Sequence, residues 1–230
     1  MNTVLLLTGT INVQNISFMK RNDYETRKND YERSLNKWLK IKDLKIVFVE
    51  NSNFKLDEFN LKVLNNANFE YLTFNGQNFP RHKGKGYGEI RAMEYAIKNS
   101  KLINNASHIV KCNGRYFFKG IKKLVNLDYD LVCNFKKDLK YADSRVFYFN
   151  KIFFEKYFIK YKDLMDDSKL LLFENNLAKA AHLLLSDDGK WKYIPFPLII
   201  EGFSGTDNVK VNSSRNVILS YIKFIRNLLG

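Results

Sequence analysis

The chain has 230 residues, of which 45% are hydrophobic and 27% are charged. This apolar content suffices for a packed core and excludes a disordered chain, while only 3 prolines and 11 glycines exclude collagen-like repeats and Pro-rich linkers, so one compact domain is favoured. The formal net charge of +14 favours an anionic partner, and its effect depends on where the positive residues cluster.

The first half of the chain alternates apolar runs with segments of helical spacing. Runs bounded by turn-forming residues predict buried strands at residues 3–8, 44–50, 69–74 and 107–112. Helical spacing of apolar side chains predicts helices at residues 21–40, 56–65 and 87–99. Crossovers of this length between strands predict an α/β fold with a mostly parallel central sheet flanked by helices.

The second half is less regular. Short strands are expected at residues 129–135, 145–149, 191–194 and 198–200, and helices at residues 152–161 and 169–185. Residues 213–229 place Ile218, Ile222, Ile225 and Leu229 at helical spacing. The charges of this last segment are positive, which is typical of a basic amphipathic helix. We therefore expect one α/β domain over residues 1–208 and a basic helix within residues 209–230.

The cysteines and the apolar runs indicate the cellular compartment in which the protein is expected. Cys112 and Cys133 lie in apolar runs without the spacing of a disulfide framework or a zinc site, so we expect buried thiols in a reducing cytoplasm. The first ten residues lack the basic region of a signal peptide. No run approaches the roughly 18 apolar residues of a membrane span. We expect a soluble or peripheral protein.

A glycine-rich segment, RHKGKGYGE at residues 81–89, precedes one of the predicted helices. Exposed backbone N–H groups, the positive end of the helix, and Lys83 and Lys85 would together suit a phosphate group. The spacing is neither that of a Walker loop nor that of a dinucleotide-binding fold. The segment therefore predicts a phosphate-binding loop, with a solvated flexible loop as the alternative.

Polar residues follow the fourth predicted strand. Asn113, Gly114 and Arg115 stand where open α/β sheets bind ligands, at the carboxyl end of a strand. Arg115 would suit a bidentate contact to a diphosphate or a carboxylate. A capped strand end with a surface arginine is the alternative.

Acidic residues supply candidates for proton transfer. Asp143, next to Arg145, is either a catalytic acid or one half of a local salt bridge in a turn. Glu174 begins a predicted helix, where it either pairs with the helix dipole or acts as a general base. Asp128 and Asp130 form the one Asp-x-Asp triplet, and they are expected to be a turn rather than a metal site.

The segment IEGFSGT, residues 200–206, has the composition of a turn after a strand. Its glycines would let the backbone fold over a ligand, and Glu201, Ser204 and Thr206 would bond to hydroxyl groups. A plain tight turn is the alternative.

The order of these parts resembles that of small bacterial glycosyltransferases of the GT-A type, which extend lipopolysaccharide, lipooligosaccharide or capsule chains. The resemblance is carried by LLLTGTI, IVFVENS, KGKGYGEIRAMEYAI, IVKCNGRYF, ADSRVFYFNKIFF and IEGFSGT. It spans residue 3 to about residue 207. It implies a single Rossmann-like domain that transfers a hexose from a nucleotide donor, usually uridine-linked, to a hydroxyl of a lipid-linked glycan.

The resemblance also implies roles for individual residues. Arg115 would stabilise the leaving diphosphate, and Glu174 or Asp143 would orient or deprotonate the acceptor hydroxyl. The residues expected to bind substrate are Thr8, Gly9, Thr10, Lys83, Lys85, Gly86, Glu89, Asn113, Arg145, Glu201 and Ser204. Most GT-A enzymes hold Mn²⁺ or Mg²⁺ with an Asp-x-Asp at the end of the fourth strand, where this chain has Asn113, Gly114 and Arg115. No metal ligand is therefore predicted there.

The resemblance gives the terminal helix a role at the anionic inner face of the plasma membrane, where a lipid-linked acceptor would lie. A helix packed on the core is the alternative. Two other classes of protein remain open. A nucleic-acid-binding protein is disfavoured because no helix-turn-helix, zinc-finger or RNP signature is present. A sugar nucleotidyltransferase would be expected to have a glycine-rich motif directly after the first strand, and LTGTINVQN is glycine-poor.

Overall fold

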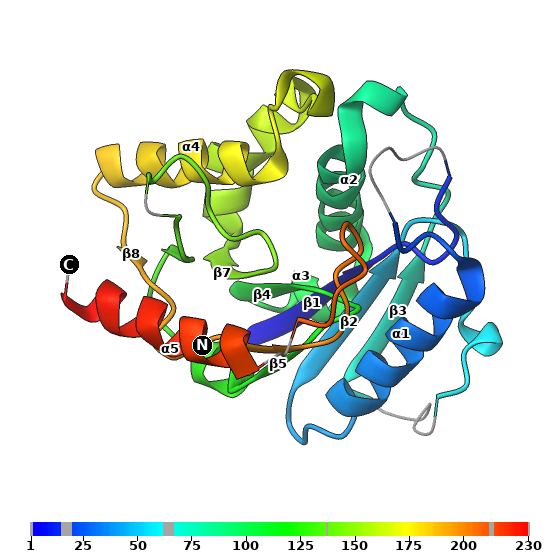
Figure 1. Ribbon diagram of the computed structural model, residues 1–230. Helices are drawn as coiled ribbons and strands as arrows, with labels where there is room; N and C mark the ends of the chain where they lie inside the picture. Colours follow the sequence, from blue (N-terminus) through cyan, green and yellow to red (C-terminus); the bar gives the residue numbers. More distant parts are fainter. Residues whose placement is uncertain (1, 15–19, 62–66, 137, 212–213, 230) are drawn as a thin grey trace.

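A seven-stranded mixed sheet forms the centre of the protein, in the order β3-β2-β1-β4-β7-β6-β8 (Figure 1). The computed structural model describes residues 2–14, 20–61, 67–136, 138–211 and 214–229. The strands are β1 (Thr3–Gly9), β2 (Lys45–Glu50), β3 (Phe69–Thr73), β4 (His108–Asn113), β6 (Leu131–Val132), β7 (Val146–Asn150) and β8 (Trp191–Lys192). The first four strands are mutually parallel, and β7 runs antiparallel to both β4 and β6. The predicted α/β fold is confirmed.

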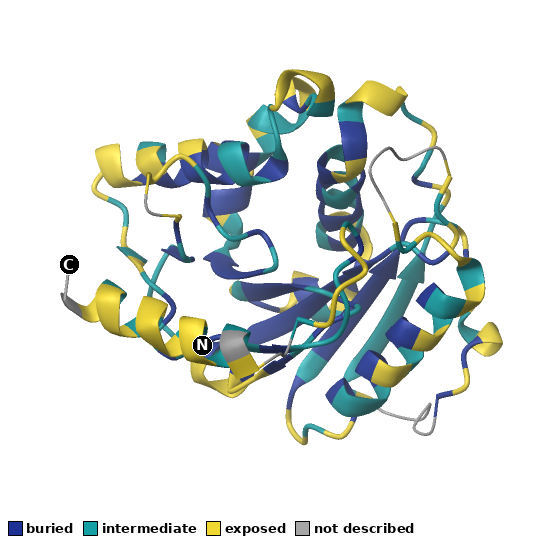
Figure 2. Ribbon diagram, in the orientation of Figure 1, coloured by how far each residue is buried: buried dark blue, intermediate teal, exposed yellow. Residues whose placement is uncertain are grey.

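Helices cover both faces of the sheet. They are α1 (Tyr24–Trp38), α2 (Gly84–Asn99), the short α3 (Lys101–Asn104), α4 (Phe173–Ser186) and α5 (Ser214–Leu229). Alternate residues of β1 face opposite layers: Val4 and Leu6 pack with α2 and α4, whereas Leu5 and Leu7 pack with α1. This burial on both faces explains why β1 reads as an unbroken apolar run. Figure 2 shows the buried central strands and the largely exposed α5.

Several predicted elements differ from the observed ones. The strand predicted at residues 198–200 is observed as β9 (Ile199–Glu201), but it lies outside the main sheet. It pairs with β5 (Phe117–Lys119), a strand that was not predicted. The helix predicted at residues 152–161 is instead a π-helical turn, Phe153–Phe158, followed by a 3-10 helix, Ile159–Leu164. Four aromatic side chains of this segment are buried together, and their packing overrides regular helix geometry.

The prediction of a helix at residues 56–65 was wrong for residues 56–61. Only Leu56–Glu58 form a 3-10 turn, and residues 62–66 lie outside the described ranges. Phe59 is buried against Phe54, with 4.6 Å between their ring centroids. This contact turns the chain inward before a helix can continue. No helix in the described ranges is both long and apolar enough to cross a bilayer.

Both cysteines are buried and unpaired, as expected from the apolar runs that contain them. Burial raises the pKa of the Cys133 thiol to about 12. Neither thiol is therefore a reactive thiolate near neutral pH.

A buried carboxylate holds together the loops at the carboxyl edge of the sheet. Glu50, the last residue of β2, is fully buried. It accepts hydrogen bonds from the backbone N–H groups of Ile11 (3.0 Å), Ser52 (2.9 Å) and Phe54 (2.9 Å), and from the Thr73 hydroxyl (3.1 Å). These donors come from the segments that follow β1 and β2 and from the last residue of β3. One side chain thus fixes two loops and a strand end relative to one another.

Replacing this carboxylate tests the role. Glu50→Ala is expected to lower the free energy of unfolding by about 3 kcal/mol, because several buried donors lose their acceptor at once. Urea unfolding followed by circular dichroism measures the change. Glu25→Ala, at an exposed position of α1, is the matched control and should change stability by about 0.5 kcal/mol or less. A Glu50→Ala protein as stable as this control would contradict the role.

Candidate functional site

A pocket of about 270 Å³ opens where β1, β2 and β4 end, the edge at which open α/β sheets bind ligands. Its walls come from these strand ends, from the first turns of α2 and from residues 204–206. The structure brings most of the predicted site residues together here: Thr8, Gly9, Thr10, Lys85, Glu89, Asn113, Arg115, Arg145, Glu174 and Ser204. These residues are separated by up to about 200 positions in sequence, so the strand order is what assembles them.

A buried lysine lies beneath this pocket and contacts three of its lining residues. Lys111 lies on β4 with a side chain that is 0% exposed. Its ammonium lies 2.5 Å from Glu89 Oε1, and it donates to Asn113 Oδ1 and to the Ser144 carbonyl oxygen, both at 2.6 Å. Three acceptors thus satisfy all three N–H bonds of the ammonium, which a charge buried this deeply requires.

The network of Lys111 continues in both directions. The Thr8 hydroxyl donates to Glu89 Oε1 at 2.8 Å, and the Ser144 hydroxyl donates to Glu174 Oε1 at 2.6 Å. A chain of polar contacts therefore runs under the pocket from β1 through α2 and β4 to α4. Because Lys111 neutralises Glu89, the charges left to face a ligand are mainly positive.

The glycine-rich segment is not a loop. Residues 81–83 form a 3-10 turn, and α2 begins at Gly84, three residues earlier than predicted. Gly84 has φ +72°, and a Cβ there would overlap the Asp167 carboxylate, 1.9 Å from its Cγ. Asp167 thus fills the start of α2, close to the Lys85 backbone N–H, and burial raises the pKa of its carboxyl. The prediction of a loop was wrong, and the Asp167 carboxylate occupies the helix end at which a phosphate was expected.

Two predicted residues of this segment lie away from the pocket. Gly86 is buried in α2, where a Cβ would stand 2.9 Å from Phe173 Cβ, so it serves close packing. Lys83 donates from its ammonium to the carbonyl oxygen of Asp163. Lys85 is the lysine of this segment that lines the pocket.

Two positive side chains face the pocket without a charged partner. Lys85 Nζ donates to the Thr206 hydroxyl at 3.0 Å, and the Arg115 guanidinium lies against Gly205, so close that a Cβ there would be 2.5 Å from Nη2. Neither side chain forms an ion pair with any residue in the described ranges. Both are available to a ligand that carries negative charge.

The side chains at the end of β4 are poor ligands for a divalent cation. Asn113 Oδ1 already accepts from the buried Lys111, and Arg115, which lines the same pocket, brings a positive charge. Across the described part of the chain, no group of three or more His, Cys, Asp or Glu side chains is placed to hold a metal. Asp128 is paired with Lys190 at 2.9 Å, and Asp130 accepts from Asn150, so this triplet shapes a turn.

The two acidic candidates differ sharply. Asp143 forms a two-pronged ion pair with Arg145, with contacts of 2.8 and 2.5 Å. Burial acts to raise the pKa of Asp143, but the charge and hydrogen bonds of Arg145 hold it below the usual range, which makes a poor proton acceptor. Glu174, on the first turn of α4 as predicted, lines the pocket and is bonded only to the Ser144 hydroxyl among the contacts described. The geometry favours Glu174.

Glu201 lies outside the pocket. Its carboxylate pairs with Lys37 and Lys119 in a separate depression of about 330 Å³ that also borders Arg115. The hydrogen bonds to Lys37 and Lys119 lower the pKa of Glu201, although burial opposes them. Its role is to hold β9 and β5 against α1.

Three lining residues that contact the predicted Thr10 were missed from the sequence: Tyr31, Asn51 and Arg27. Thr10, directly after β1, donates from its backbone N–H to Tyr31 Oη at 2.9 Å and from its hydroxyl to Asn51 Oδ1 at 2.6 Å. The buried Arg27 guanidinium donates to the Thr10 carbonyl oxygen. Asn51 follows β2 as Thr10 follows β1, so the strand-end rule that indicated Asn113 and Arg115 also applied to it. Arg27 and Tyr31 come from the middle of α1 and carry no such signal.

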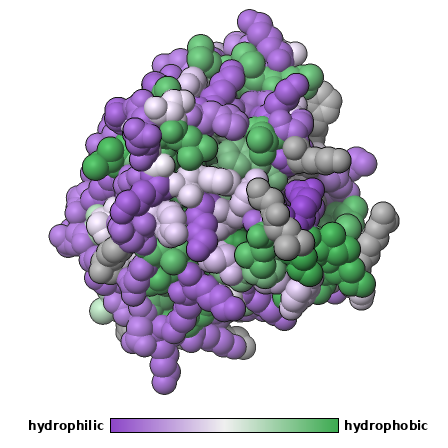
Figure 3. Space-filling view, turned by 90° about the vertical axis from the view of Figure 1, so that its left-hand side faces the viewer, coloured by the Kyte–Doolittle hydropathy of each residue, from purple (hydrophilic) through white to green (hydrophobic). Residues whose placement is uncertain are grey.

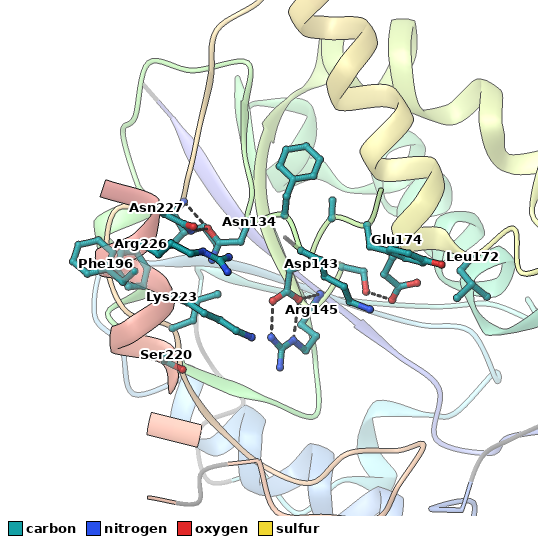
Figure 4. Close-up of a pocket in the computed structure, with 18 of the residues that line it drawn as sticks. Asn134, Asp143, Arg145, Leu172, Glu174, Phe196, Ser220, Lys223, Arg226 and Asn227 are labelled. Carbon is teal, nitrogen blue, oxygen red and sulfur yellow. Dashed lines mark hydrogen bonds and ion pairs between the residues drawn. The ribbon is translucent and has the colours of Figure 1, made fainter. Parts of the chain in front are cut away.

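A second, larger cavity of about 820 Å³ adjoins the first (Figure 4). Lys85, Ser144, Arg145 and Glu174 line both. The larger cavity extends between the start of α4 and α5, and Figure 4 shows the Asp143–Arg145 pair between these two helices. Asp143 belongs to this cavity and not to the smaller pocket. The two spaces meet at Glu174.

Comparison with known proteins bears on the fold. No protein-family model matches the sequence, and no significant match to a curated protein was found. The apo structure of WbbM, a bifunctional glycosyltransferase, is similar to 99% of this chain with a TM-score of 0.54 and 12% identity. The chain spans only 44% of that protein. A glycosyltransferase therefore shares the α/β fold described above.

Two further structures are more distant. One is a putative nucleotide-diphospho-sugar transferase from Desulfovibrio desulfuricans G20, with a TM-score of 0.48 and 10% identity over 84% of this chain and 79% of that chain. The other is the galactosyltransferase LgtC in complex with donor and acceptor sugar analogs, with a TM-score of 0.44 and 9% identity over 82% and 72%.

The Lys111–Glu89 pair can be tested by a double-mutant cycle. Lys111→Met should cost about 3–5 kcal/mol of unfolding free energy, because Glu89 is left without its counter-charge in a largely buried site. Combining it with Glu89→Gln should recover at least about 1 kcal/mol, since the remaining groups are then neutral. Urea unfolding of the four proteins measures the coupling. Strictly additive effects would show that the pair is not coupled.

Proposed function

We propose that this protein is a glycosyltransferase that moves a sugar from a nucleotide donor, most simply a uridine-linked one, to a hydroxyl of a lipid-linked surface glycan. The observation that carries the proposal is the pocket at the ends of β1 and β4, which presents Arg115 and Lys85 beside the carboxylate of Glu174. The fold shared with a glycosyltransferase supports it. Positive charge for a diphosphate and a base for a hydroxyl are what this reaction requires.

The transfer assigns a task to each of these groups. The acceptor oxygen forms a bond to the anomeric carbon of the donor sugar, and the bond from that carbon to the diphosphate oxygen breaks. The electron pair of the broken bond leaves with the nucleoside diphosphate, whose growing negative charge is met by Arg115 and Lys85. The proton of the acceptor hydroxyl passes to Glu174, which is placed where the two cavities meet.

Basic side chains take the place of a metal in this proposal. The end of β4 offers a guanidinium and an amide already bonded to Lys111, and neither suits a divalent cation. The fixed geometry of an arginine fork matches two phosphate oxygens. Transfer is therefore expected to proceed in EDTA. Loss of transfer in EDTA with recovery in Mn²⁺ would contradict this part of the proposal.

Nucleotide binding gives a direct test. UDP should raise the melting temperature of the protein, and short oligonucleotides should not. Arg115→Gln should fold normally, because the one hydrogen bond of the guanidinium within the described ranges is a long contact of 3.5 Å to the Phe203 carbonyl oxygen. It should weaken UDP binding about tenfold through loss of a charge-assisted hydrogen bond. Arg115→Lys should recover part of the loss.

Lys179→Gln, on the exposed side of α4, removes one positive charge away from the pocket and is the matched control. It should bind UDP as the unaltered protein does. Equal UDP affinity of the Arg115→Gln and Lys179→Gln proteins would contradict the placement of the diphosphate. Stabilisation by oligonucleotides alone would favour a nucleic-acid-binding protein.

The apolar side chains of α5 point away from the protein. Ile218, Ile222, Ile225 and Leu228 are 52 to 66% exposed, while the side chain of Leu229 lies outside the described set. Figure 3 looks onto this side of the molecule and shows a hydrophobic patch at its lower right. The residues of α5 that line cavities are mainly polar. The alternative of a helix packed on the core by its apolar face does not fit these exposures.

We propose that this face of α5 lies on an anionic membrane. The helix contains no acidic residue, and Lys210, just before it, is exposed. A helix with an apolar face and no negative charge is suited to the interface of anionic lipids, where a basic residue near the surface contributes about 1 kcal/mol. The protein would then act at the inner face of the plasma membrane, next to a lipid-linked acceptor.

Vesicle sedimentation tests the membrane face. The protein should bind vesicles that contain phosphatidylglycerol, and the pair of substitutions Ile222→Glu and Ile225→Glu should abolish binding, because both positions would enter the lipid interface. Leu185→Glu, at an exposed leucine of α4, is the control and should leave binding unchanged. A soluble dimer that these two isoleucine substitutions dissociate, with no binding to vesicles, would contradict the proposal and assign the face to a second copy.

A further inference from the structure

The larger cavity has the size and lining of a binding site for a small saccharide. Its volume of about 820 Å³ lies within the range of ligand sites in proteins. Apolar and aromatic side chains form much of its wall, including Phe135, Tyr141, Phe196 and Phe224. The cavity meets the smaller pocket at Glu174, so a ligand within it would present a hydroxyl to that carboxylate.

The charges in this cavity are not balanced. Asp143 is neutralised by Arg145, and the Asp167 carboxylate is held at the start of α2 near Lys85. Lys223 and Arg226, which project from α5 into the cavity, form no ion pair within the described ranges. Figure 4 shows both side chains on the α5 side and Glu174 on the opposite, α4 side.

A third cation lines the same cavity. Lys136 has its ammonium 4.5 Å from the centre of the Tyr141 ring, and it has no acidic partner among the described residues. Glu174 is the one acidic side chain of the lining that is neither ion-paired nor placed against the start of α2. A cavity whose lining has more unpaired positive than negative charges attracts anions and disfavours a ligand with positive charge.

We propose that the acceptor is an anionic saccharide, one that carries a phosphate or carboxylate group, and that Lys223 and Arg226 bind this group while the reacting hydroxyl lies at Glu174. This deepens the proposed function and rests on it. The two faces of α5 then have separate tasks: the isoleucines contact lipid, and the two cations contact the acceptor. The anionic group and the reacting hydroxyl lie at opposite ends of the cavity, which sets the orientation of the acceptor.

Calorimetric titration with three soluble probes tests this inference: lactose, lactose phosphate and digalacturonate. Saturating UDP is present so that the probes do not enter the smaller pocket. The two anionic probes should bind about tenfold more tightly than lactose, and this preference should fall with added salt. The double variant Lys223→Gln/Arg226→Gln should bind all three probes within about threefold of one another, and Lys179→Gln should retain the preference.

The outcomes separate this inference from the proposed function. Equal binding of lactose and the anionic probes, or a preference that survives in the double variant, would overturn the inference. Failure of the unaltered protein to bind UDP would instead contradict the proposed donor site. If the double variant loses binding to phosphatidylglycerol vesicles while its preference for anionic probes is unchanged, the two cations serve lipid headgroups and the inference is also overturned.

Discussion

The buried charge of Lys111 is the constraint on which the site depends. An ammonium with no exposure must keep all its hydrogen bonds, and its three acceptors come from α2, from the end of β4 and from the segment before β7. Glu89 lies on the first of these elements and Arg115 directly after the second, and Ser144 of the third donates to Glu174 of α4. Holding the ammonium therefore also holds the walls of the pocket, and Glu50 does the same for the loops after β1 and β2 and for the end of β3.

Internal charge pairs decide which positive residues remain for a ligand. The chain carries a large excess of lysine and arginine, yet many of these side chains at the site have internal partners: Lys111 with Glu89, and Arg145 with Asp143. The helix end that the glycine-rich segment suggested as an anion site is filled by Asp167. What is left is Arg115 and Lys85 in one pocket, and Lys136, Lys223 and Arg226 in the other. The unpaired positive charge of the site thus lies at two places, one suited to a diphosphate and one to an acidic ligand.

Helix α5 connects the chemistry to the surface on which we propose that the enzyme works. Its polar side closes the larger cavity, and its apolar side is open to the surroundings. A helix with this orientation gains little stability from the core of the protein itself, because the apolar stripe that would normally be buried against the core faces outward. A lipid surface would supply the missing burial and would place the cavity mouth beside lipid-linked molecules.

The sequence by itself determined the parallel strands and the helices between them, since both leave a local pattern. A strand buried on two faces requires an unbroken apolar run, and a helix buried on one face requires apolar residues at helical spacing. It also identified Asn113 and Arg115, because residues that follow buried strands gather at one edge of the sheet. The sequence did not reveal the partners of the charges. Asp167 meets Gly84 and Lys111 meets Glu89 across long stretches of chain, and the direction in which the stripe of α5 points depends on its docking. Only the tertiary structure decided these, because contacts between distant segments leave no periodic signal in the chain.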